Sequence, residues 1–165
     1  MTPAPIVDTK RVTNRRTVAI KTPDDLLAEV DRLISADRAG TLTLRGNWTL
    51  GQTLGHLAAW IDYGFDGFPT TPPLIIRIVL RLMKSRFFGD KPMPAGVRIP
   101  GIKAGTHATE RLPLADGERK FRAAVSRLKA GPPRGPHPIF GPLSHDEWWA
   151  MHLGHARLHL SFMET

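Results

Sequence analysis

The chain has 165 residues, of which 41% are hydrophobic, with a formal net charge of +8 and no cysteine. This length is typical of one domain with a buried core. The absence of cysteine excludes disulfides, thiolate metal ligands and a cysteine nucleophile. Lys and Arg are scattered from Lys10 to Arg157 without a dense run. We therefore do not expect a nucleic-acid partner, despite the positive charge.

Residues 1–21 are polar and basic, and we expect a basic N-terminal arm there, followed by a single domain over residues 22–165. Thr22 and Pro23 are typical of the cap and first position of a helix. Apolar residues then recur at helical spacing until about Gly40. The arm lacks the apolar stretch of a signal peptide, so we expect a cytoplasmic protein.

A second helix is predicted from about residue 50 to residue 65, because Thr49 and Gln52 form a capping-box pattern before an apolar stripe. A third is expected over residues 74–87. Its apolar run is short and contains arginines, so it is not a membrane span. We therefore expect no membrane partner.

Two Pro- and Gly-rich stretches, residues 88–113 and 131–143, should lack long regular elements. Between them, residues 116–129 return to helical periodicity. The last helix should start at Ser144, which forms a capping box with Glu147. Five helical patterns and no convincing strand predict an all-α fold, with a four-helix bundle as the commonest outcome.

The last helix carries three histidines. His155 and His159 are four residues apart, which places both rings on one helix face, within reach of one metal ion. His152 is seven residues from His159, roughly 10 Å along the axis, so we expect it to line the pocket and not to ligate. His56, among apolar residues of the second helix, is the candidate third ligand. The long loops should then lie near the mouth of this site.

Other interpretations stay open at this point. A histidine on an apolar face is more often a hydrogen-bonded core residue than a ligand, and an i, i+4 histidine pair alone is weak evidence for a metal. No glutamate of the H-E-x-x-H kind accompanies the pair. The remaining histidines, His107, His137 and His145, are expected to be exposed and without a special role, and the tryptophans to be core residues.

Several segments together resemble the DinB/YfiT-like superfamily of predicted metalloenzymes, within a branch of unknown function. The resemblance extends over most of residues 14–163. It is carried by Gly46-Asn-Trp-Thr-Leu-Gly-Gln-Thr-Leu-Gly-His-Leu-Ala, Asp66-Gly-Phe-Pro, Pro92-Met-Pro-Ala-Gly, His137-Pro-Ile-Phe-Gly, and Glu147-Trp with the run from His152 to Phe162.

This resemblance implies a four-helix bundle in which His56, His155 and His159 hold one divalent metal ion, with Zn, Ni, Fe and Mn all open. Relatives often carry a histidine just before the last ligand, where this chain has Leu158. Characterised members include transferases that use small thiols, an activity that does not transfer automatically to this branch.

Two functions follow as alternatives. The first is a metal-dependent transferase or hydrolase acting on a small molecule, with a low-molecular-weight thiol as a cosubstrate and with His152, Gln52 and Trp60 lining the pocket. No catalytic acid or base is assigned; Asp62, Asp66 and Glu147 lie on suitable helices. The second is a non-catalytic helical binding or interaction module with structural histidines. A homodimer is open in either case.

Overall fold

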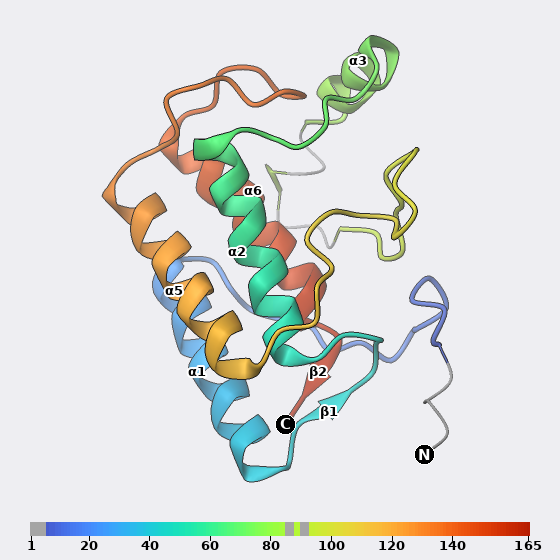
Figure 1. The fold of residues 1–165 in the computed structure, drawn as a ribbon, viewed down its shortest axis with the longest axis vertical. Coiled ribbons are helices and arrows are strands. Elements are labelled where there is room, and N and C mark those ends of the chain that lie inside the picture. The colour runs from blue at the N-terminus through green and yellow to red at the C-terminus, as the bar shows by residue number, and fades with distance from the viewer. Residues whose placement is uncertain (1–5, 85–87, 90–92) are drawn as a thin grey trace.

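The computed structural model describes residues 6–84, 88–89 and 93–165. These residues form five helices and a small antiparallel sheet (Figure 1). The elements are α1 (Pro23–Ala39), β1 (Thr43–Leu44), α2 (Leu50–Asp66), α3 (Leu74–Leu82), α5 (Leu114–Ala130), α6 (His145–Leu160) and β2 (Met163–Glu164). The prediction of a mainly helical chain is confirmed, whereas the two-residue strands were not predicted. A bundle of the DinB/YfiT type stays a prediction.

Local sequence explains where α1 and α6 begin. The Thr22 side chain accepts the backbone N–H of Asp25, whose carboxylate accepts the backbone N–H of Thr22 in return. Ser144 and Glu147 form the same reciprocal pair at α6. Each box satisfies two backbone donors that have no partner inside the helix. Both predicted helix starts are therefore confirmed.

The start of α2 differs from the prediction. Thr49 accepts the backbone N–H of Gln52, but the Gln52 side chain does not complete the predicted box. It donates instead to the carbonyl oxygen of Thr109 at 2.8 Å. Gln52 is therefore used to hold a distant loop against α2, a role that local spacing does not reveal.

Helix α2 lies between its neighbours: it packs along α5 and also contacts α6 and α1. Figure 1 shows these four helices side by side, with α3 apart from them. In α3, which ends earlier than predicted, no residue is buried; residues 85–87 of the prediction lie outside the described part. No helix in the described ranges is long and apolar enough to cross a membrane.

A close approach fixes the start of α5 on α2. A Cβ atom on Gly51 would lie 2.5 Å from the carbonyl oxygen of Leu112, and one on Gly117 would overlap the backbone of Gly51. Only glycine lets the two backbones come this near. The contact draws the chain preceding α5, which includes residues 107–109, across the face of α2 that carries His56.

The described part of the predicted N-terminal arm packs against the helices. Val18 is 7% exposed and Ile20 1% exposed, and both belong to the hydrophobic core. Arg15 donates to the hydroxyl of Ser161 at 3.1 Å, and Arg16 pairs with Glu29 on α1. The segment thus joins α1 to the end of α6.

Candidate metal centre

Three histidines from two helices meet between α2 and α6, where His56 is buried and His155 and His159 are half-buried. The Nε2 atom of His56 on α2 lies 3.2 Å from Nε2 of His155 on α6, which lies 3.0 Å from Nε2 of His159. The candidate ligand atoms of all three are within 4.8 Å of one another. A tetrahedral ion with Zn–N distances of about 2.0–2.1 Å requires nitrogens about 3.3 Å apart. The expected convergence of His56 on the His155–His159 pair is therefore present.

Backbone carbonyls determine which nitrogen of His56 is free. Its Nδ1 lies 3.0 Å from the carbonyl oxygen of His107 and 3.3 Å from that of Ala108. A carbonyl can only accept, so Nδ1 carries the hydrogen and Nε2 keeps its lone pair. A histidine that binds a metal through one nitrogen almost always donates the other N–H in this way. His56 is thus oriented as a ligand.

The donor set fits a borderline divalent ion. With Nε2 unprotonated, the lone pair of His56 points toward the other two imidazoles, an arrangement that needs a proton or a cation between the rings. Burial lowers the pKa of His56 to about 4. Burial, and to a smaller extent the electrostatic effect of the neighbouring His56, lowers the pKa of His159 to about 3. Burial also lowers the pKa of His155. The rings are neutral at pH 7, the form that coordinates Zn, Ni or Fe.

The loop over His56 is held in an uncommon conformation. Ala108 has φ 54°, the only positive φ of a residue other than glycine within the described ranges. An alanine in this left-handed region costs roughly 1–2 kcal/mol. The hydrogen bonds from Gln52 to Thr109 and from His56 to Ala108 lie next to the strained residue. Strain kept at such a position is typical of a functional site.

Two tryptophans enclose the histidines. The ring of Trp48 stacks on His159 with centroids 5.2 Å apart and planes at 1°, and it meets His56 edge-on at 4.8 Å. The ring of Trp60 lies 5.6 Å from that of His155, between ring centroids. Trp60 does not line the cavity beside His159, so its place in a pocket lining stays a prediction. Trp48 was assigned to core packing by its sequence; it precedes the helix, so helical periodicity could not place it.

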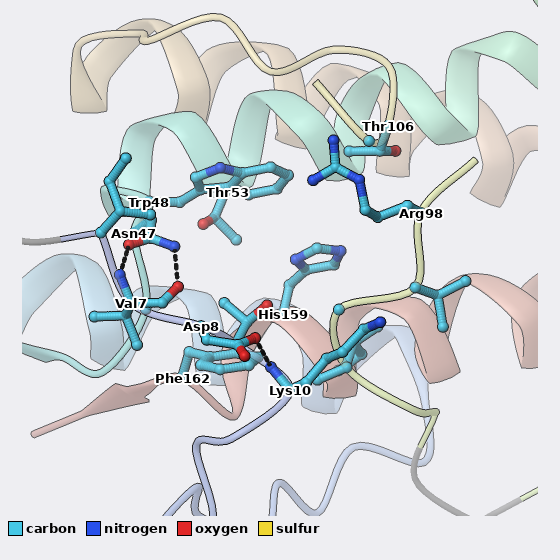
Figure 2. Close-up of a pocket in the computed structure, with 18 of the residues that line it drawn as sticks. Val7, Asp8, Lys10, Asn47, Trp48, Thr53, Arg98, Thr106, His159 and Phe162 are labelled. Carbon is cyan, nitrogen blue, oxygen red and sulfur yellow. Dashed lines mark hydrogen bonds between the residues drawn. The ribbon is translucent and has the colours of Figure 1, made fainter. Parts of the chain in front are cut away.

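A cavity of about 540 Å³ opens beside His159 (Figure 2). Its walls include Trp48, the loop segments 95–98 and 104–106, and residues 6–10 of the N-terminal segment. The expectation that residues 88–113 border the site thus holds for its described lining segments. The second loop, residues 131–143, does not line this cavity.

A family model described as "Protein of unknown function (DUF1569)" matches residues 12–165, and this range includes all three histidines. The chain belongs to the DUF1569 family. No curated protein matches it, and no solved structure does. The family description assigns no activity to this DUF1569 protein.

His152 is not part of the cluster of three in this DUF1569 protein. It is 4% exposed, stacks on Trp148 with centroids 5.9 Å apart, and its Nε2 has no hydrogen-bond partner among the described residues. Burial lowers its pKa to about 3. That His152 is not a ligand remains a prediction, supported by its position outside the group of nitrogens.

The expectation that His107, His137 and His145 are exposed was wrong: His107 and His145 are half-buried, and His137 is buried. His145 is the first residue of α6, and its Nε2 accepts from the indole N–H of Trp149.

His137 is 5% exposed, lies against Phe68 and Phe140, and its Nδ1 accepts the backbone N–H of Ile139 at 3.1 Å. Irregular segments lack a repeating apolar pattern, so this burial was not visible in the sequence. His107 also has a role, because its carbonyl accepts from His56.

The three carboxylates considered for acid–base chemistry are occupied elsewhere. Asp62 and Asp66 both pair with Arg127, at 3.2 and 2.7 Å, and Glu147 pairs with Lys84 while also capping α6. In this DUF1569 chain they act as surface ion pairs and a helix cap. None is therefore assigned as a catalytic base.

Proposed function

We propose that this DUF1569 protein holds one divalent metal ion through His56, His155 and His159 and admits a small molecule to it from the cavity beside His159. The observation that carries the proposal is the convergence of the three Nε2 atoms, with neighbouring pairs 3.0 and 3.2 Å apart. The backbone acceptors at Nδ1 of His56 support it, because they leave Nε2 free to coordinate.

The chain's own residues prepare this site in three ways. The loop carbonyls orient His56, the indole of Trp48 fixes the ring plane of His159 by stacking, and Trp60 covers the side of His155. The indole N–H of Trp60 is buried without a partner among the described residues. It is a donor next to the site that a bound molecule can satisfy.

The finer part of the proposal is an enzyme of the metal-dependent transferase or hydrolase class. A divalent ion held by three imidazoles keeps a position open, where it acidifies water or binds a thiolate. Because the chain has no cysteine, a thiol would come from a small cosubstrate. The similarity to the DinB/YfiT-like superfamily belongs to this proposal, and the pairing of one histidine on α2 with an H-x-x-x-H on α6 supports it.

A non-catalytic binding module is the second candidate. One observation favours it: the three carboxylates considered for acid–base chemistry, Asp62, Asp66 and Glu147, are engaged in ion pairs, so none is assigned as a general base. A transfer assay with small thiols and an electrophilic acceptor, run on the metal-loaded chain, separates the two. Turnover above that of the free metal ion supports the enzyme, and its absence supports the module.

The metal itself is tested by analysing the chain purified without a histidine tag. We expect close to one equivalent of a divalent metal per chain, retained after dialysis. His155→Ala and His159→Ala should each weaken metal binding by more than about 100-fold. Each removes a ligand itself, which costs more than removing a hydrogen-bond partner that orients a ligand.

His152→Ala is the matched control, since it removes a buried histidine from the same helix without touching the three nitrogens. It should weaken binding far less. An unloaded wild-type chain that also fails to bind added metal, or equal losses in all three variants, would rule out the proposed ligand set.

A further inference from the structure

The cavity beside His159 carries unpaired positive charge. Two cationic residues line it, Lys10 and Arg98, and neither forms an ion pair with any described residue. The carboxylate in the lining, Asp8, lies 3.4 Å from the guanidinium of Arg11 and accepts the backbone N–H of Lys10. The charges of Lys10 and Arg98 are therefore not neutralised by a described carboxylate and can meet a negative group.

Two glycines make room for these cations. Gly96 (φ 69°) and Gly105 (φ 87°) both have left-handed backbones that favour glycine. A Cβ atom on Gly96 would overlap the stem of Lys10, and one on Gly105 would lie 3.2 Å from the guanidinium carbon of Arg98. Each cation thus lies against a glycine of the same loop. Arg98 is further held by donating to the carbonyl oxygen of Lys103 at 2.8 Å.

The rest of the lining includes apolar and aromatic side chains. Trp48, Phe162 and Leu158 line the cavity together with His159. Figure 2 shows the ring of His159 pointing into the cavity, with Arg98 and Lys10 extending around it from separate segments of the chain. A volume of about 540 Å³ suits a small organic molecule and exceeds the needs of a lone inorganic ion.

We propose that this cavity binds a small organic acid, with its negative group at Lys10 and Arg98 and its apolar part against Trp48 and Phe162. This assigns a substrate class to the site. The orientation of the bound acid toward His159 rests on the metal ion proposed above. The contacts of its negative group with Lys10 and Arg98 do not depend on that metal ion. Arg98 supplies a planar set of donors suited to a carboxylate or phosphate, and Lys10 supplies a point charge.

The test uses 3-phenylpropionate and its neutral amide, 3-phenylpropanamide, which have nearly the same shape and differ in charge. Each is titrated into the ¹⁵N-labelled full chain at low salt, with and without zinc, and amide and indole NMR shifts are followed. We expect the acid to bind roughly fivefold tighter than the amide in both forms. The shifts should occur at Trp48, Gly96 and Gly105. Tighter binding of the acid in the zinc form alone would mean that zinc recognises it, which would overturn the proposal.

Single substitutions test whether the charges of Lys10 and Arg98 bind the acid group. Lys10→Gln and Arg98→Gln should each lower the affinity for the acid roughly threefold to fivefold and leave the amide unchanged. Lys103→Gln removes the same charge from the same loop but not from the cavity lining, and should have no effect. Equal affinity for acid and amide, or an equal loss in Lys103→Gln, would overturn the proposal.

Two glycine variants test whether the position of Lys10 against Gly96 matters for acid binding, and neither changes any charge. Gly96→Ala should displace the lysine and weaken acid binding, whereas Gly101→Ala, at φ 81° with no neighbour within 4 Å, carries the same backbone strain alone. An equal loss of acid affinity in the two variants would contradict the proposed position of Lys10 against Gly96. Metal content is measured on the same samples. A chain that takes up no metal but binds the acid in this charge-dependent way would refute the proposed function and keep the acid site.

Discussion

At His56, the ring nitrogen available to a metal is selected by a loop more than fifty positions further along the chain. The carbonyls of His107 and Ala108 accept from Nδ1, and Gln52 holds the neighbouring Thr109. The sequence placed His56 and Gln52 on one face of a helix, because they are four residues apart. It did not predict their partners, since the conformation of an irregular loop has no periodic signature.

The strained residue in that loop gives a prediction. Ala108→Gly should raise the free energy of unfolding by up to about 1 kcal/mol, because glycine adopts a φ of 54° without the alanine penalty. Urea denaturation of the metal-free chain measures it. Ala104→Gly is the control in the same loop at a position without positive φ, and should lower stability through the entropy of the unfolded chain. Equal losses in the two variants would show that Ala108 is not strained.

At the scale of elements, α2 is the scaffold of the site. Gln52, His56 and Trp60 recur every four residues along it, and all three face the loop or the histidines of α6. The existence and limits of the main helices followed from caps and apolar spacing. Their pairing did not, because the Gly51–Gly117 approach of α2 and α5 depends on two backbones distant in sequence. The exposure of α3 also went unpredicted, since its apolar pattern resembles that of a buried helix.

Gly51→Ala tests whether this approach positions the site. The added methyl group would lie 2.5 Å from the carbonyl oxygen of Leu112 and must push the chain before α5 away from α2. We expect a loss of about 1–3 kcal/mol in the free energy of unfolding and weaker metal binding, as the loop carbonyls leave His56.

Gly135→Ala is the matched control, because a Cβ atom at this position meets nothing within 4 Å. It should change stability by less than about 0.5 kcal/mol and leave metal binding intact. Full metal affinity in Gly51→Ala would mean that the loop position does not matter for the site.

Across the described part of the molecule, buried and half-buried histidines dominate the response to pH. Burial lowers the pKa of five of them below the usual 6.5 in the described chain: His56, His137, His152, His155 and His159. The unfolded chain binds protons near pH 6.5, whereas the folded chain does so only at lower pH. Stability is therefore complete above pH 6.5 and falls as the pH drops toward the lowered pKa values.

The metal-free chain should consequently unfold in mild acid. Each histidine with a lowered pKa removes up to about 1.4 kcal/mol per pH unit below 6.5, so together they cost several kcal/mol by pH 5.5, comparable to the stability of a small domain. Circular dichroism of the metal-free chain from pH 8 to 4 measures this loss. With metal bound to three of the rings, unfolding should need a lower pH. A metal-free chain equally stable at pH 7.5 and pH 5 would contradict the burial of these groups in neutral form.

The most direct measurement of the central claim is X-ray absorption at the zinc edge of the loaded, untagged chain. We predict three imidazole nitrogens at about 2.0–2.1 Å and at least one further light atom that is not a histidine nitrogen. His56→Ala should lower the imidazole count, because His56 is the ligand contributed by α2. A spectrum with one or two imidazoles in the wild type, or one unchanged by His56→Ala, would contradict the three-histidine centre.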